Sequence, residues 1–247
     1  MEWAWFFDID GTLVEIASRP SGIVVHRDLP ALIEHLDALT GGAVALVTGR
    51  AISDVDDLIP LSGIHLAGQH GLEIRPSEGS GLSVANHAGD IERVRDELAV
   101  EIAHHPGLVL EFKGMSLALH YRLAPQLAGH AHRILAKLGK LYAPGFVLQK
   151  GKRVVELMPP GVDKGAAIRS IMTREPFAGR KPIFIGDDVT DETGFRTINE
   201  MNGYSVKVGA GPTVATCRLR NVTEVRDWLR KGLMDIEESE CPGGIAP

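Results

Sequence analysis

The segment Trp3–Leu13 has the sequence WAWFFDIDGTL, and it decides which fold the rest of the chain can adopt. Its first five residues are apolar, which is typical of a buried β-strand, and two acids, Asp8 and Asp10, follow directly. Side chains alternate faces along an extended segment, so we expect both carboxylates on the same side. Two carboxylates in one small space bind a cation, share a proton, or divide the roles of nucleophile and acid.

Two simpler interpretations of this segment are an ordinary Asp-Gly turn and a calcium-binding loop. The turn stays open on these residues alone, because Asp-Gly turns are common. The calcium loop is excluded, because its sixth and twelfth positions require Gly and Glu and hold Leu13 and Arg19 here. The rest of the chain must therefore decide whether the acids are catalytic.

The composition is that of an ordinary globular protein with an acidic balance. The 247 residues, 44% hydrophobic and 23% charged, suffice for one large or two modest domains. A net charge of −6 argues against nucleic acid as the main partner. Cys217 and Cys241 form neither a Cys-x-x-Cys metal clip nor a disulfide framework, so zinc is not expected.

The sequence has no feature of a membrane or secreted protein. No apolar stretch approaches the length of about 20 residues that spans a bilayer. The first residues also lack the basic region of a signal peptide. We therefore expect a cytoplasmic protein with no membrane partner. A monomer is expected as well.

Strand and helix patterns alternate on both sides of a middle segment that is ordered differently. Residues 1–76 and 160–247 alternate as parallel-sheet α/β proteins do. Residues 77–159 have the order helix, strand, strand, helix, strand, strand, which is typical of a small antiparallel sheet carrying two helices. The sequence thus predicts an α/β core interrupted by an inserted α+β domain. Residues 237–247 carry acids, glycines and prolines without periodicity, and we expect them to be disordered.

The patterns predict individual elements as well. The expected strands are residues 3–7, 43–47, 64–67, 108–112, 116–121, 146–149, 154–158, 182–185 and 204–208. The expected helices are residues 29–39, 51–59, 90–104, 126–141 and 164–172, a helix near 193, and residues 222–233.

Polar residues follow three of the predicted core strands at their carboxyl ends, where open parallel sheets bind ligands. Asp8 and Asp10 follow the first strand, Thr48–Arg50 follow the second, and Gly186–Asp188 follow the strand at 182–185. We expect these clusters to meet at one edge of the sheet. Thr48 is equally compatible with a helix N-cap, and Asp191 with an acid in the first turn of a helix.

Lys164 and the acids point to an anion and a cation in the same site. Lys164 opens a predicted helix, where the dipole disfavours a cation, so a bound anion explains it better than helix stability does. A solvated surface lysine stays the alternative. Asp8, Asp10, Asp187 and Asp188 would repel one another without a counter-ion. Oxygen ligands with open, water-filled positions suit Mg²⁺ rather than zinc or copper.

These residues, in this order, resemble a known superfamily. Its four motifs match Asp8-x-Asp10-Gly11-Thr12, Thr48, Lys164, and Gly186-Asp187-Asp188-x-x-Asp191, and they are those of haloacid dehalogenase-type phosphatases. Within it, the chain resembles the trehalose-6-phosphate phosphatase family in the segments 68–71, 111–114, 120–122, 151–156, 161–165 and 186–192. The resemblance covers residues 6–228, and the segments of the inserted domain are more specific than the first motif.

The resemblance implies an α/β fold with a Rossmann-like parallel-sheet hydrolase core, residues 1–76 and 160–247, and an inserted α+β cap domain, residues 77–159, that closes over the substrate. It implies a Mg²⁺-dependent phosphatase that hydrolyses trehalose 6-phosphate to trehalose and phosphate, a step of trehalose biosynthesis. The reaction would pass through an aspartyl-phosphate.

The resemblance also implies roles for the core residues. Asp8 would be the nucleophile and Asp10 the general acid and base. Thr48, Lys164 and backbone N–H groups around residues 9–11 would neutralise the phosphoryl charge. The Asp8 carboxylate, the Asp10 carbonyl and Asp187 would bind Mg²⁺, with Asp188 and Asp191 orienting the metal ligands and Lys164.

Specificity would come from residues that contact the substrate, mostly on the cap. Paired carboxylates and cations suit the many hydroxyls of a disaccharide. The predicted substrate-binding residues are Gly11, Thr12, Gly49, Arg50, His70, Glu111, Lys113, Arg122 and Glu156. The alternative for Glu111, Lys113 and Glu156 is cross-strand charge pairing on an exposed sheet. His120 is expected to be a structural neighbour only.

Three alternatives stay open on the sequence. The first is a phosphatase of another sugar phosphate, such as sucrose or glucosylglycerol phosphate, with the same core and a different cap. The second is a catalytically silent sugar-phosphate sensor, against which the retained acids and Lys164 argue. The third is a phosphomutase, which would require a bisphosphate activator.

Overall fold

Eight strands form the larger of two sheets in the structure, a computed structural model that describes residues 2–17, 22–61, 63–77, 83–84 and 90–240. The strand order is β12-β11-β10-β1-β2-β3-β4-β5. All neighbours are parallel except at the β3–β4 and β4–β5 pairings. The strands are β1 (Trp3–Phe7), β2 (Val44–Val47), β3 (His65–Gly68), β4 (Glu73–Arg75), β5 (Ser83–Val84), β10 (Lys181–Gly186), β11 (Tyr204–Val208) and β12 (Cys217–Leu219).

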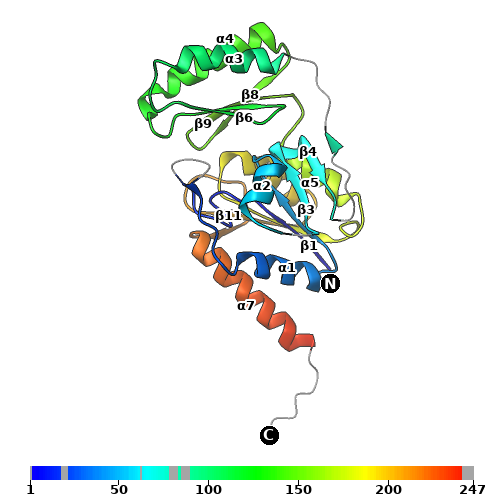
Figure 1. Cartoon of the computed structure of the whole chain (residues 1–247). Coiled ribbons are helices and arrows are strands. Elements are labelled where there is room, and N and C mark those ends of the chain that lie inside the picture. Colours follow the sequence, from blue (N-terminus) through cyan, green and yellow to red (C-terminus); the bar gives the residue numbers. More distant parts are fainter. Residues whose placement is uncertain (1, 18–21, 62, 78–82, 85–89, 241–247) are drawn as a thin grey trace.

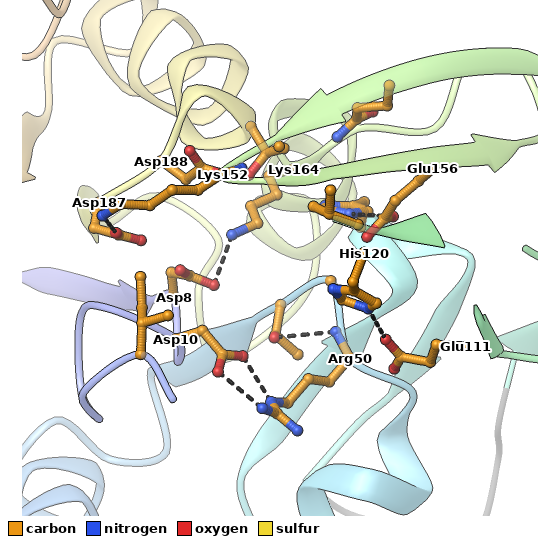
Figure 2. Close-up of a pocket in the computed structure, with 18 of the residues that line it drawn as sticks. Asp8, Asp10, Arg50, Glu111, His120, Lys152, Glu156, Lys164, Asp187 and Asp188 are labelled. Atoms are coloured by element: carbon orange, nitrogen blue, oxygen red, sulfur yellow. Dashed lines mark hydrogen bonds and ion pairs between the residues drawn. The ribbon is translucent and has the colours of Figure 1, made fainter. Parts of the chain in front are cut away.

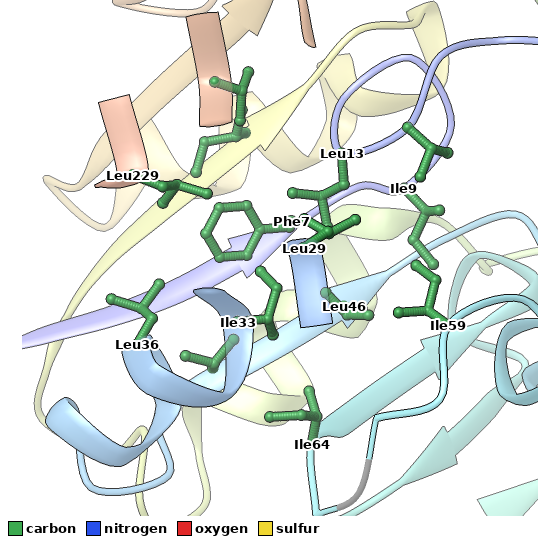
Figure 3. Close-up of a cluster of buried hydrophobic side chains, with 14 of the residues drawn as sticks. Phe7, Ile9, Leu13, Leu29, Ile33, Leu36, Leu46, Ile59, Ile64 and Leu229 are labelled. Carbon is green, nitrogen blue, oxygen red and sulfur yellow. The ribbon is translucent and has the colours of Figure 1, made fainter. Parts of the chain in front are cut away.

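Helices cover both faces of this sheet, so its central strands are apolar on both sides (Figure 1). The helices α1 (Leu29–Leu39), α2 (Ile52–Leu58) and α7 (Val222–Glu240) pack on one face, around a buried cluster that contains Phe7 and Leu46 (Figure 3). The helices α5 (Lys164–Met172) and α6 (Glu192–Glu200) pack on the other face, where Phe6 is buried. Neighbouring phenylalanines on β1 thus serve two cores, because side chains alternate along a strand.

The middle of the chain forms a second, antiparallel sheet of four strands in the order β6-β7-β9-β8. Two helices, α3 (Ile91–Ile102) and α4 (Ala128–Tyr142), cover its outer face and enclose a separate apolar cluster (Figure 1). Its other face looks toward the larger sheet, and the polar side chains on that face therefore meet the core. The strands are β6 (Val109–Phe112), β7 (Leu117–His120), β8 (Val147–Gly151) and β9 (Val154–Met158).

The predicted fold class is confirmed, with three differences in the elements. The pattern analysis missed β4, β5 and β12, each only two or three residues long. Strand β5, within the range expected for the inserted domain, pairs with β4 in the larger sheet. The disorder expected from residue 237 is wrong for residues 237–240, which continue α7 to Glu240. No Gly or Pro interrupts the chain there before Pro242, which explains the longer helix. Residues 241–247 lie outside the described residues.

Short 3₁₀ turns among the described residues include η2 (Gln69–Gly71), η3 (Pro125–Leu127) and η4 (Val189–Asp191). The turn η2 directly follows β3, and two residues separate η4 from the end of β10; His70 of η2 and Thr190 of η4 line the pocket described below. Among the described residues, no helix is both long enough and apolar enough to cross a membrane.

The central strand β2 offers a test of how much the core depends on its packing. Val44 is fully buried in the cluster beneath α1 and α7, whereas Val24 is 83% exposed. We expect Val44→Ala to lower the free energy of unfolding by about 2 to 3 kcal/mol, since two buried methyl groups and a filled space are lost. Val24→Ala removes the same atoms and should change it by less than about 0.5 kcal/mol. Urea denaturation measures both, and equal effects would contradict the assigned core.

Candidate active site

The polar clusters at the strand ends meet in one pocket between the larger sheet and the inserted domain, as the topology predicted (Figure 2). Asp8 and Asp10 follow β1, Thr48 follows β2, and Asp187 follows β10. These strands are neighbours, so their carboxyl ends bring the four side chains to the same edge of the sheet. Side chains from the inserted domain close the pocket from the opposite side.

A buried lysine lies at the base of this pocket. The Lys164 Nζ atom donates to Asp8 Oδ1 and to Asp191 Oδ1, both at 2.6 Å. All three side chains are almost fully buried. Lys164 is the first residue of α5, and Asp163 caps that helix by accepting from the Ala166 N–H. Asp163 thus caps the helix, and the Lys164 ammonium binds the two carboxylates. Because Lys164 is buried, the alternative of a solvated surface lysine is excluded.

The pKa shifts at this site show that it carries an excess of negative charge. Burial raises the pKa of Asp8 well above its ordinary value, and Asp191 and Asp187 raise it further against the effect of Lys164. Burial and Asp191 also raise the pKa of Asp187 to about 6. Although burial disfavours the charged lysine, Asp191 and Asp8 raise the pKa of Lys164. The buried Lys164 ammonium and the more exposed Lys152 ammonium, 3.1 Å from Asp187, do not balance three close carboxylates. A cation would relieve the remaining repulsion.

The residues present fit a metal ion. Asp8, Asp187 and Asp191 are buried, and each offers an oxygen atom within 4.8 Å of the others. Both Asp191 oxygens already accept hydrogen bonds, Oδ1 from Lys164 and Oδ2 from the Asp188 N–H at 2.8 Å. Asp191 therefore suits the orienting role predicted for it, and Asp8 and Asp187 have more freedom to bind a cation. The Asp10 carboxylate lies outside this group, and only its carbonyl was predicted as a ligand.

Asp10 and Arg50 form a two-pronged ion pair. Arg50 Nε donates to Asp10 Oδ2 at 2.6 Å, and Nη2 donates to Oδ1 at 2.8 Å (Figure 2). Thr48 Oγ1 accepts from the Arg50 N–H at 3.2 Å. Helix α2 begins only at Ile52, so Thr48 is not its N-cap. Thr48 is buried at the pocket wall instead.

The loop after β1 requires glycine at one position. Gly11 has a φ of +83°, and a Cβ atom there would lie 2.3 Å from Asp187 Oδ2. Its N–H donates to Val14 O, and the Thr12 N–H donates to Ile9 O. Gly11 and Thr12 were predicted to bind substrate, and in this structure their N–H groups bond within the loop itself. Gly49 is constrained in a similar way, since a Cβ atom would lie 2.8 Å from His70 Nε2.

Glu156 ties the inserted domain to the core. Its Oε1 accepts from Lys113 Nζ at 3.1 Å, and its Oε2 lies 3.1 Å from His70 Nε2. Lys113 Nζ also donates to the carbonyl of Gly49 at 2.6 Å. Although burial alone would raise the pKa of Glu156, Lys113 and His70 hold it well below its usual range. These side chains are buried in the pocket wall, so they are not surface charge pairs on an exposed sheet.

The other predicted residues of the inserted domain also line the pocket. Glu111 Oε2 lies 2.6 Å from His120 Nε2, so His120 holds a pocket carboxylate in place (Figure 2). His120 is thus more than the structural neighbour that was expected. The Arg122 guanidinium donates to the carbonyls of Ala17 and Lys152, which bridges the inserted domain and the loop after β1.

The prediction omitted several polar side chains of this region, among them Lys152 and Gln69. Lys152, at the β8–β9 turn, donates from Nζ to Asp187 Oδ2 at 3.1 Å and from its N–H to Asp188 Oδ2 at 2.9 Å. Gln69 joins the core to the β6–β7 turn. Both residues lie in segments that carried the family resemblance, 151–156 and 68–71. That resemblance is the sequence signal by which they could have been predicted.

Comparison with known proteins identifies the family to which this geometry belongs. The family model for trehalose-phosphatase matches residues 6–222. The chain belongs to the trehalose-phosphatase family. It is 41% identical over 228 residues to the trehalose-6-phosphate phosphatase of Escherichia coli K12, covering 92% of this chain and 85% of that protein.

Solved structures agree with this trehalose-phosphatase assignment. A crystal structure titled a trehalose-6-phosphate phosphatase related protein is 26% identical, with a TM-score of 0.80 over 96% of this chain and 99% of the other. A haloacid dehalogenase-like hydrolase from Bacteroides thetaiotaomicron has a TM-score of 0.66 at 14% identity, over 94% and 99% of the two chains. The second likeness shows that the fold is the haloacid dehalogenase-like one.

Because the pKa of Asp187 is raised, we expect cation binding at this site to depend on pH. The folded protein binds the Asp187 proton more tightly than the unfolded chain, with a pKa of about 6 against 3.8. Without metal, this group therefore lowers stability as the pH rises from about 4 to 6. A cation binds the ionised carboxylate, so we expect millimolar Mg²⁺ to raise the melting temperature at pH 7.5 more than at pH 5. Calorimetry measures this, with Asp187→Asn as the control that should lose the difference. An equal rise at both pH values would contradict the assignment.

Proposed function

We propose that this protein hydrolyses trehalose 6-phosphate to trehalose and phosphate, with Mg²⁺ as the metal ion. The observation that carries the proposal is the buried arrangement of Asp8, Lys164 and Asp191 beside Asp187, facing polar side chains of the inserted domain across one pocket. The core residues supply what phosphoryl transfer needs, a nucleophile among neutralising charges. The inserted domain supplies what a neutral disaccharide needs, hydrogen-bonding groups at a distance from the phosphate.

Asp8 is the proposed nucleophile. In the first step one oxygen of its carboxylate attacks phosphorus, forming an aspartyl-phosphate, while the bond from phosphorus to the sugar oxygen breaks. In the second step a water molecule attacks phosphorus, and the bond to Asp8 breaks, which releases phosphate and restores the carboxylate. Lys164 holds the Asp8 carboxylate in place. Its Nζ donates to Asp8 Oδ1, which leaves Asp8 Oδ2 to attack phosphorus.

Asp10 is the proposed general acid and base. It donates a proton to the departing sugar oxygen, and in the second step it accepts a proton from the attacking water. Arg50 occupies both Asp10 oxygens in this structure. Asp10 must gain a proton before it acts as the acid, so Arg50 must release at least one oxygen. Arg50 was predicted to bind substrate, and turning toward the substrate would release Asp10 as well.

The remaining core residues neutralise charge. Lys164 and Thr48 lie at the pocket base, where they offer an ammonium and a hydroxyl to phosphoryl oxygens. The Asp8 carboxylate, the Asp10 carbonyl and Asp187 are the proposed ligands of Mg²⁺, which when bound supplies a positive charge for the phosphoryl group. Asp188 and Asp191 orient this set, Asp191 through Lys164 and Asp188 through the β8–β9 turn.

The inserted domain is the proposed source of specificity. We propose the division made from the sequence, core residues 1–76 and 160–247 and cap residues 77–159, with β5 assigned to the core sheet because it pairs there. Glu111, Lys113 and Glu156 would bind sugar hydroxyls from the cap side. His120 would fix the Glu111 carboxylate, and His70 the Glu156 carboxylate.

The proposal is tested by phosphate release with Mg²⁺ from trehalose 6-phosphate, sucrose 6-phosphate, glucose 6-phosphate and an aryl phosphate at matched concentrations. We expect strong preference for trehalose 6-phosphate, and Asp8→Asn should lower kcat at least about 10³-fold, since it removes the nucleophile with little change in volume. Preference for another sugar phosphate would support the proposed mechanism and contradict the proposed substrate. Absence of hydrolysis with all four, or full activity of Asp8→Asn, would contradict the proposal.

The cap assignment predicts a substrate-dependent effect of Glu156→Gln. The amide keeps the shape of the side chain but removes the charge that pairs with Lys113 and His70. We expect kcat/KM for trehalose 6-phosphate to fall about 10- to 100-fold, as for a lost charged hydrogen bond, and that for an aryl phosphate to fall less than about threefold. Glu101→Gln, on the exposed surface of α3, is the matched control. Equal losses on both substrates would remove Glu156 from the sugar site.

A further inference from the structure

Gln69 joins the core to the inserted domain through a side-chain amide whose hydrogen-bonding groups are all used. Its Nε2 donates to Glu73 Oε1 at 2.7 Å and to the carbonyl of Lys113 at 2.6 Å. Its Oε1 accepts from Ser116 Oγ at 2.7 Å. Gln69 is 1% exposed and Ser116 2% exposed. An amide has two N–H donors, and both Gln69 donors are hydrogen-bonded here.

The two contacts in the inserted domain are the two ends of one turn. Lys113 and Ser116 close the β6–β7 turn, in which the Lys113 N–H donates to Ser116 O at 3.0 Å. Gln69 binds the carbonyl of the first residue and the hydroxyl of the last, so it contacts the turn at both ends. Such a contact forms only when the turn lies at one position against the core.

The core end of this contact is held firmly. Gln69 and His70 both have positive φ, +46° and +60°, which side-chain-bearing residues disfavour. The Gln69 N–H donates to Arg50 O at 2.7 Å, and the His70 N–H donates to Thr48 O at 2.9 Å. The backbone of η2 is thus fixed to the loop after β2, and the Gln69 amide has a defined direction.

We propose that Gln69 is a positioning residue that holds the inserted domain closed over the substrate, which rests on the proposed function of Lys113 and Glu156. The Gln69 latch consists of the Gln69 amide with Glu73, Lys113 and Ser116. By fixing the backbone of Lys113, the latch lets the Lys113 ammonium reach both Gly49 O and Glu156. Of the four latch residues, Lys113 lines the pocket, whereas Gln69, Glu73 and Ser116 do not.

Losing the amide disfavours the closed arrangement more than the open one, because the bond to Glu73 lies within the core and is lost in both. When the inserted domain is closed, an apolar residue at position 69 leaves the Lys113 carbonyl and the Ser116 hydroxyl buried without their present partner. When the domain moves away, water satisfies both groups. The substitution therefore shifts the equilibrium toward the open arrangement, and the apparent affinity for a substrate that needs closure falls by the same factor.

The kinetic experiment compares Gln69→Leu with the wild-type protein. The expected result is a KM for trehalose 6-phosphate raised about 10-fold, with kcat and the kinetic constants of an aryl phosphate changed less than about threefold. Gln126→Leu, which removes an exposed amide on η3, is the matched control and should match the wild type. A fall in kcat on both substrates with unchanged KM would overturn the proposal, because it would place the effect in the core chemistry.

A second variant guards against misfolding. Ser116→Ala removes one hydrogen bond from the cap side of the latch and should raise the KM for trehalose 6-phosphate by about threefold. In the Gln69→Leu background it should add almost nothing, because its partner is already gone. Additive effects of the two substitutions on KM would overturn the latch.

A distance measurement separates this inference from the substrate assignment. Spin labels at Cys217 in the core and at Glu101→Cys on α3, with Cys241→Ser, report the separation of the domains in the presence of Mg²⁺ and inorganic phosphate. We expect Gln69→Leu to lengthen this distance and Gln126→Leu to leave it unchanged. Identical distances in Gln69→Leu and the wild type would overturn the latch. If the wild type fails to hydrolyse trehalose 6-phosphate but the distance lengthens, the substrate assignment fails and the latch stands.

Discussion

The structure depends on the buried ammonium of Lys164, which lies between Asp8 and Asp191 at 2.6 Å from each. Removing charged groups from water is costly, and the cost is offset only when the partners are close and fully hydrogen-bonded. Lys164 joins the first strand, the start of α5 and the turn after β10, which are far apart in sequence. The parallel sheet is what brings these segments to one edge, so the fold and the charge arrangement require each other.

The same arrangement leaves a charge imbalance that defines the chemistry. Asp187, at the end of β10, has its pKa raised to about 6 by burial and by Asp191, although Lys152 opposes this. Gly11 gives this carboxylate its space, because any Cβ atom there would overlap it. A site with excess negative charge and space beside a nucleophile attracts a divalent cation, and that cation then attracts an anionic substrate.

Polar side chains link the inserted domain to this centre. Lys113 binds the carbonyl of Gly49, Lys152 contacts Asp187 and Asp188, and Gln69 binds the β6–β7 turn. Each of these groups can be hydrated when the domains separate. Polar contacts of this kind fix a position without making closure irreversible, which suits a domain that must admit a disaccharide and release the products.

The sequence by itself determined the α/β core, the inserted domain and the segments that carry the chemistry. Apolar periodicity, turn residues and acids at strand ends are local properties, and a short span of chain shows them. It missed β4, β5 and β12, because two or three residues give no readable period, and it ended α7 too early. The tertiary structure alone decided the pairings: Arg50 with Asp10, His120 with Glu111, Lys152 with Asp187, and Gln69 with the β6–β7 turn. These contacts join residues whose proximity depends on strand order and on how the two domains meet. No local pattern in the sequence encodes that proximity.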